Sequence, residues 1–129
     1  MSSRTVTGVL AAAGGACWIV KTLLIWASGG TNTTGGAVGL LFLAGTAFLA
    51  TAVGRWAWGA TAERAMPLRI LAVVCALVGL FVAVNLPILV GYALLPGSWL
   101  AEEIGVFAVA ILAIVAGMVG IRSHIRGPA

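Results

Sequence analysis

The chain has 129 residues, of which 62% are apolar and 8% are charged. A water-soluble domain needs more polar residues to cover its surface, and a disordered chain contains fewer apolar ones, so both classes are excluded. The 7 basic and 3 acidic residues give a net charge of +4, but six of the basic residues, the arginines, lie near the ends of apolar segments. This placement predicts an integral membrane protein whose surroundings are the lipid bilayer, with no nucleic acid as a partner.

Four apolar segments follow one another along the chain, and each is long enough to cross a hydrocarbon core of about 30 Å. They run from about 6 to 28, 36 to 54, 68 to 95 and 99 to 121. Turn-forming residues separate them, in the segments 29–35, 55–67 and 96–98. The sequence therefore predicts an all-α fold, with a single transmembrane domain built as a four-helix bundle. Pro67 suits the first turn of the third helix, and Ser98 is a predicted N-cap of the fourth.

The distribution of arginine predicts how the bundle is oriented, because basic residues near helix ends are retained on the cytoplasmic side of a membrane. If the N-terminus is cytoplasmic, all six arginines are cytoplasmic too: Arg4, Arg55, Arg64, Arg69, Arg122 and Arg126. Both termini are then expected in the cytoplasm of a multi-pass protein of the bacterial inner membrane.

Lys21 is the most informative residue of the chain, because it lies inside the first apolar segment, about 12 Å below its outer end. A lysine near mid-membrane costs roughly 2.5 to 3.5 kcal/mol, so such residues usually face the interior of the bundle or reach toward the interface. Helical spacing places Gly14, Cys17, Lys21 and Ser28 on one stripe of the first helix. We expect this stripe to pack against the fourth helix, where small residues follow Glu102 at Gly105, Val109, Ala113, Ala116 and Gly120.

The third segment adds Asn85 and Tyr92 on one face, with Pro87 expected to kink the helix and to free the carbonyl of Ala83 near the Asn85 amide. We expect Lys21, Asn85, Tyr92 and Glu102 to form an intramembrane polar cluster in the outer half of the membrane, with Lys21 near Glu102 and Glu103 facing away. Three interpretations stay open. The cluster is a structural ion pair with interhelical hydrogen bonds, the lining of an outer cavity that binds a solute or ion, or a contact with a partner subunit.

The second segment contains Gly35-x-x-x-Gly39 and a ridge formed by Thr46, Ala50 and Gly54, a spacing that lets helices approach closely. We expect ordinary packing within the chain there rather than a dedicated dimer face.

Few residues are suited to chemistry. Cys17 and Cys75 are isolated in apolar runs and His124 is the single histidine, so neither a metal site nor a cofactor is expected. No paired carboxylates or nucleophile and base occur at one membrane depth, so we do not expect an enzyme. The sequence favours a structural or accessory subunit of a membrane complex, and a homo-oligomer is also possible. The alternative is a small carrier or channel component that binds a solute or anion around Lys21.

Overall fold

The computed structural model describes residues 2–30 and 36–125, with the side chains of 124 and 125 excepted. Four α-helices make up this part of the chain: α1 (Ser3–Ala27), α2 (Gly36–Ala60), α3 (Met66–Leu94) and α4 (Trp99–Ile125). Each is long and apolar enough to cross a membrane, which confirms the predicted all-α fold with four candidate spans. The Gly35 end of the expected glycine motif, residues 31–34 of the first linker and Arg126 lie outside the described residues.

Helix α2 continues six residues beyond the end predicted at 54, to Ala60. The prediction ended where hydrophobicity falls, at Arg55, but the residues that follow contain no proline and the backbone hydrogen bonds continue. The turn after α2 is then closed by Arg69, whose guanidinium lies 3.8 Å from the ring centroid of Trp58 and donates to the Trp58 carbonyl at 3.3 Å.

The predicted roles of Pro67 and Ser98 at the starts of α3 and α4 are confirmed. Pro67 lies in the first turn of α3, where its missing N–H costs no hydrogen bond. At the start of α4 the Ser98 hydroxyl accepts a hydrogen bond from the Leu100 amide at 3.2 Å. Pro87 lies within α3, which continues as one helix from Met66 to Leu94.

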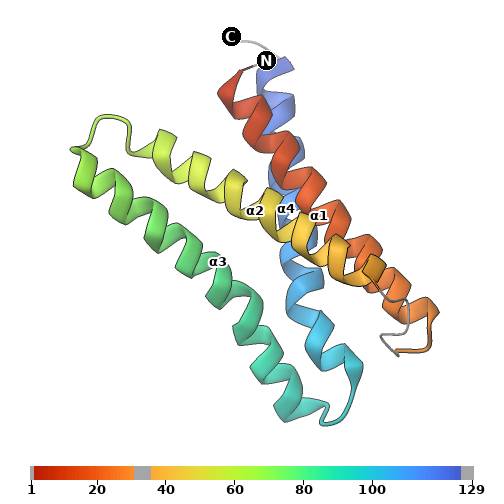
Figure 1. The fold of residues 1–129 in the computed structure, drawn as a ribbon. Coiled ribbons are helices and arrows are strands. Elements are labelled where there is room, and N and C mark those ends of the chain that lie inside the picture. Colours follow the sequence, from red (N-terminus) through yellow and green to blue (C-terminus); the bar gives the residue numbers. More distant parts are fainter. Residues whose placement is uncertain (1, 31–35, 126–129) are drawn as a thin grey trace.

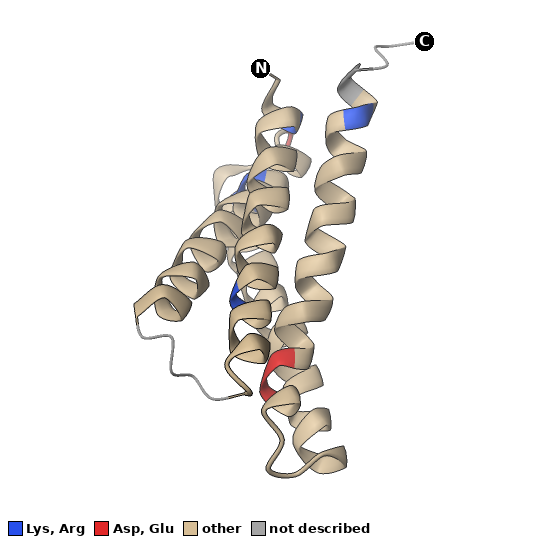
Figure 2. Cartoon of the chain, turned by 90° about the vertical axis from the view of Figure 1, so that its right-hand side faces the viewer, with Lys and Arg blue, Asp and Glu red and all other residues tan. Residues whose placement is uncertain are grey.

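The helices form two hairpins, α1 with α2 and α3 with α4 (Figure 1). The two hairpins contact each other where α1 packs on α4 and where α2 packs on α3. Because the chain direction alternates from helix to helix, the start of α1, the end of α4 and the α2–α3 turn lie toward the same end of the molecule. We call this the arginine end, because it holds the described arginines: Arg4, Arg55, Arg64, Arg69 and Arg122. Figure 2 shows most of the basic segments toward this end and the acidic segment of α4 toward the other.

Helices α1 and α4 approach until their backbones touch. A Cβ added at Gly8 would lie 2.7 Å from the Gly117 carbonyl oxygen, and one at Gly15 would lie 2.6 Å from that of Ala110. The expected packing of the first helix on the fourth is therefore confirmed, but the closest contacts use other residues than expected. Gly120 of the expected row does meet α1, where an added Cβ would lie 3.9 Å from the Arg4 carbonyl oxygen. Gly14, which we expected to face α4, faces α2 instead, because a Cβ there would lie 3.0 Å from the Gly45 carbonyl oxygen.

Helix α4 also uses small residues to approach α3. A Cβ at Gly91 of α3 would lie 3.0 Å from the Cα of Ala101, and one at Gly105 would clash with the Val84 carbonyl. The expectation that Gly105 faces the first helix is therefore wrong. Small residues occur on two faces of α4, so their spacing alone did not identify which neighbour each face contacts.

On α2 the expected packing within the chain occurs at Gly54, the last residue of the predicted ridge, and not at Gly39. A Cβ at Gly54 would meet Val73 of α3 at 3.8 Å, whereas one at Gly39 would meet nothing within 4 Å. Gly39 is therefore not a contact between helices of this chain.

Candidate intramembrane polar site

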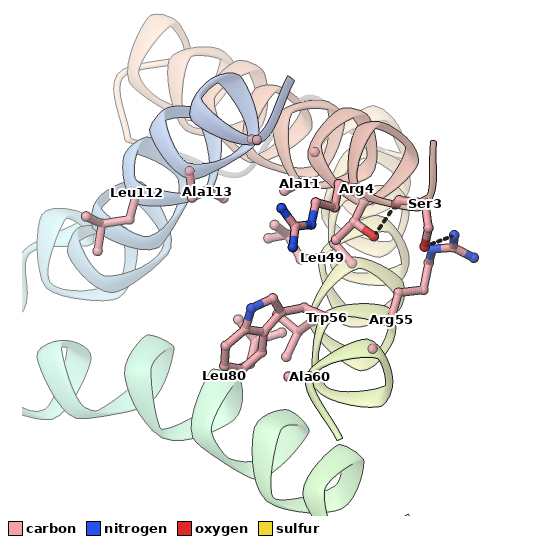
Figure 3. Close-up of a pocket in the computed structure, with 18 of the residues that line it drawn as sticks. Ser3, Arg4, Ala11, Leu49, Arg55, Trp56, Ala60, Leu80, Leu112 and Ala113 are labelled. Carbon is pink, nitrogen blue, oxygen red and sulfur yellow. Dashed lines mark hydrogen bonds between the residues drawn. The ribbon is translucent and has the colours of Figure 1, made fainter. Parts of the chain in front are cut away.

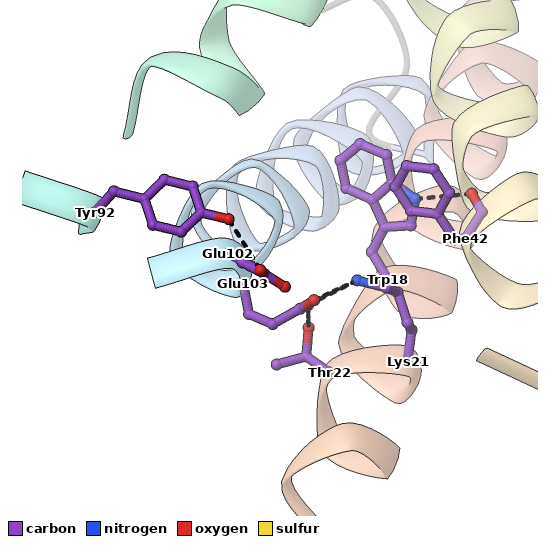
Figure 4. Close-up of polar contacts among 7 residues, drawn as sticks. All are labelled: Trp18, Lys21, Thr22, Phe42, Tyr92, Glu102 and Glu103. Atoms are coloured by element: carbon purple, nitrogen blue, oxygen red, sulfur yellow. Dashed lines mark hydrogen bonds and ion pairs between the residues drawn. The ribbon is translucent and has the colours of Figure 1, made fainter. Parts of the chain in front are cut away.

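The polar site is centred on an ion pair between α1 and α4 (Figure 4). The Lys21 ammonium donates to both carboxylate oxygens of Glu103, with each Nζ to Oε distance 2.7 Å. The hydroxyl of Thr22 donates to Oε2 of the same carboxylate at 3.0 Å. Lys21 and Glu103 are each 7% exposed, so the pair is shielded from the surroundings of the bundle. Two opposite charges at this distance neutralise each other, and the hydroxyl adds a further hydrogen bond to the carboxylate.

The structure corrects the expected partner of Lys21 from Glu102 to Glu103. Consecutive residues on an α-helix point about 100° apart, so only one of the two glutamates can face α1. The face of α4 that contacts α1 carries Ala110 and Gly117, and Glu103 lies on that face, with Val106 between it and Ala110. This face could have been recognised in the sequence from the spacing of Glu103, Val106, Ala110 and Gly117. The prediction used the row of small residues that contains Gly105 instead.

Helix α2 covers the pair with an aromatic ring. The Phe42 ring stacks on Trp18 with centroids 5.9 Å apart, and the Trp18 indole N–H donates to the Phe42 carbonyl at 3.2 Å. The Lys21 ammonium lies 5.4 Å from the centroid of the same Phe42 ring, within the range of a cation–π interaction. Trp18 is 2% exposed and fits against Gly45, where any Cβ would clash with the indole. Trp18 and Phe42 therefore fix the side of the pair that faces α2.

The other predicted members of the cluster lie apart from Lys21. The Tyr92 hydroxyl donates to Oε1 of Glu102 at 2.9 Å, on the exposed side of α4, so these two residues do meet as expected. The Asn85 amide donates to the carbonyl of Phe81 at 2.8 Å, one turn earlier in its own helix. The expectation that Asn85 meets Lys21 or the Ala83 carbonyl is therefore wrong, because the amide is satisfied locally by its own backbone.

A cavity of about 320 Å³ lies beside the ion pair, toward the end opposite the arginines. Its lining includes Lys21, Glu102, Glu103, Phe42 and Trp99, but neither Asn85 nor Tyr92. One positive and two negative side chains give this lining a formal charge of −1. A cavity therefore does lie beside Lys21, as one interpretation expected. Its lining is negatively charged, however, whereas a site that attracts an anion would be positively charged.

A larger cavity, of about 860 Å³, opens at the arginine end between the two hairpins. We call it the inner cleft. Apolar residues from all four helices form most of its lining, among them Leu49, Val53, Trp56, Leu80, Leu112 and Ala113. Ser3, Arg4, Thr7 and Arg55 supply its polar groups. Sequence reasoning did not predict this cleft, because it arises from the divergence of the hairpins and no motif encodes it.

The chemistry available at the ion pair is limited by its own contacts. Lys21 and Thr22 both donate hydrogen bonds to Glu103, so the arrangement joins α1 to α4. Within the part of the chain that the structure describes, no three His, Cys, Asp or Glu residues are grouped so as to hold a metal ion.

Comparison with protein families, with curated proteins and with solved structures finds no match to this chain.

Proposed function

We propose that this protein is a non-catalytic accessory subunit of a larger membrane complex. It lies in the inner membrane of a bacterium with both termini in the cytoplasm, an orientation favoured by the arginines at one end of the bundle. The proposal concerns how the protein meets a partner within the bilayer, so the relevant features are the helix faces that the chain does not use for its own packing.

The observation that carries the proposal is a row of small residues on the outward face of α3. Cys75, Gly79 and Ala83 are spaced four residues apart and are all exposed, and a Cβ at Gly79 would meet nothing within 4 Å. Small residues in this spacing let a second helix approach closely within a membrane. Gly91 is the one buried residue of α3, so the face of this helix that points away from α2 and α4 is available for contact outside the chain.

The internal pairing of Lys21 supports the same function. A charge that is fully paired within the chain stabilises the bundle but contributes little to binding a substrate, whereas a binding site presents polar groups that are free to meet a ligand.

The native Cys75 allows a direct test. A short crosslinker that reacts with the Cys75 thiol at one end and carries a photoreactive group at the other should join Cys75 to a different protein through α3 in native membranes. Gly79→Leu should prevent the crosslink, because the larger side chain blocks close approach while leaving the fold intact. Val78→Leu, a neighbouring exposed position on another face, is the matched control and should crosslink normally. A crosslinked dimer of this chain alone would favour a homo-oligomer, and the absence of any crosslinked species would contradict the proposal.

The second candidate, a small carrier, is favoured by the presence of two cavities toward opposite ends of the bundle. The cavity beside the ion pair has an acidic lining with the aromatic rings of Phe42 and Trp99, which suits an organic cation rather than an anion. Binding of tetramethylammonium to the purified protein should then weaken in Glu102→Gln. It should be unchanged in Glu63→Gln, which removes an exposed acid outside the cavity. Equal binding by both variants and the wild type would remove this candidate.

A further inference from the structure

The inner cleft is built like the binding site of an amphiphile. Its volume of about 860 Å³ lies within the range of ligand sites in proteins, roughly 300 to 1,000 Å³. Its polar residues, Ser3, Arg4, Thr7 and Arg55, are placed at the arginine end of α1 and α2. Leu49, Leu80 and Val109 lie near the middle of their helices, so the deeper part of the cleft is apolar.

The two arginines of the cleft differ in what they contact (Figure 3). The Arg55 guanidinium points away from the cleft and donates to the Ser3 hydroxyl at 3.3 Å. The Arg4 side chain points into the space between α1, α2 and α4, and it makes no hydrogen bond or ion pair with any described residue. No acidic residue belongs to the lining, so the charge of Arg4 is not offset within the cleft.

The cleft is also open toward the bilayer. Of the described residues, α3 contributes Leu80 alone to the lining, so most of the wall comes from α1, α2 and α4. Trp56, on the α2 wall, is 65% exposed and its indole faces the cleft. An opening of this kind in a membrane-spanning bundle is accessible to lipid, which surrounds it at high concentration and carries an aliphatic chain that matches the apolar lining.

We propose that the inner cleft binds one anionic phospholipid, with its phosphate on Arg4 and an acyl chain along the apolar wall formed by Val53, Leu80 and Leu112. The arginine guanidinium recognises phosphate oxygens with directed N–H donors, and the anionic lipids of a cytoplasmic leaflet attract basic residues that lie near the membrane surface. The inference is independent of the accessory function proposed above, since it concerns a different face of the molecule.

The test uses the full chain, stripped of lipid in detergent and titrated with phosphatidylglycerol or with phosphatidylcholine of the same acyl composition. Bound lipid is counted by native mass spectrometry. The wild type should retain one phosphatidylglycerol about fivefold more tightly than phosphatidylcholine, the factor that about 1 kcal/mol per basic residue corresponds to. Arg4→Gln should abolish this preference, and Arg4→Lys should keep most of it.

Two variants distinguish lipid binding in the cleft from general electrostatic attraction between anionic lipid and the arginines of this end. Arg122→Gln removes an exposed arginine from the same end of the molecule but outside the cleft, and it should keep the wild-type preference. Ala116→Phe fills the cleft from an exposed position on α4, and it should lower the affinity for both lipids. Circular dichroism of each variant confirms that the helices are retained.

Three outcomes would overturn the inference. The first is an unchanged lipid preference in Arg4→Gln, and the second is an equal loss of preference in Arg122→Gln. The third comes from a parallel titration with oleate: Arg4-dependent binding of oleate without binding of phosphatidylglycerol would assign the cleft to a free amphiphilic anion.

Discussion

Among single residues, the two adjacent glutamates of α4 are expected to differ most in their effect on stability. Glu103 is 7% exposed and pairs with Lys21, whereas Glu102 is exposed and contacts Tyr92. Glu103→Gln leaves the Lys21 ammonium buried without its counter-charge, which should lower the free energy of unfolding by about 3–5 kcal/mol. Glu102→Gln is the matched control and should change it little.

Reversible unfolding of both variants in detergent micelles measures the difference. Equal stability of Glu103→Gln and the wild type would show that the ion pair does not hold α1 to α4, and a larger loss in Glu102→Gln would restore the originally expected pairing.

Much of this site could be predicted from the sequence, but its geometry could not. Lys21 is conspicuous because charges are rare inside apolar segments, and Tyr92 and Glu102 do meet as expected. The choice between Glu102 and Glu103 depends on the rotation of α4 about its axis, and one residue of difference turns the side chain by about 100°. The contribution of Thr22 and Phe42 could not be predicted either, because neither residue type stands out in a membrane helix.

At the scale of helices, the contact between α1 and α4 depends on glycines that allow backbone contact. Gly15→Ala places a methyl group 2.6 Å from the Ala110 carbonyl oxygen, so the helices must separate, at a cost of about 1–3 kcal/mol. Gly79→Ala on α3 is the control, since nothing lies within 4 Å of the added carbon, and alanine favours a helix over glycine.

Thermal unfolding in the same detergent should therefore show a lower midpoint for Gly15→Ala and an equal or higher one for Gly79→Ala. If Gly15→Ala unfolds at the wild-type temperature, the close approach of α1 and α4 is wrong.

The existence of the four helices followed from the length of the apolar segments, and the starts of α3 and α4 followed from Pro67 and Ser98. The end of α2 was less accessible to prediction. Hydrophobicity falls at Arg55, but hydrogen bonding along the helix continues to Ala60 and Trp58 packs under Arg69. Hydropathy indicates where a helix leaves the hydrocarbon core of the membrane. The helix itself ends only where its backbone hydrogen bonds stop, which can be several residues later.

For the whole molecule, the concentration of arginine at one end predicts the orientation in the membrane. In a variant with Cys17 and Cys75 replaced by serine, a cysteine at Ala62 in the α2–α3 turn should be protected from an impermeant thiol reagent in intact cells. A cysteine at Ala27, at the opposite end of α1, should be labelled. A reporter fused to the C-terminus should be active in the cytoplasm. The reverse labelling pattern would place the inner cleft and the ion pair in the opposite leaflets.

In the function proposed above, the intramembrane charges of this protein maintain its structure, while α3 provides the contact with a partner. A buried ion pair that is only structural can be replaced by apolar residues of similar volume with little loss of stability. The double variant Lys21→Met, Glu103→Leu should therefore fold and should form the same Cys75 crosslink in native membranes, in the same yield as the wild type. A double variant that folds normally but no longer captures the partner would contradict the account, because the ion pair would then take part in function itself.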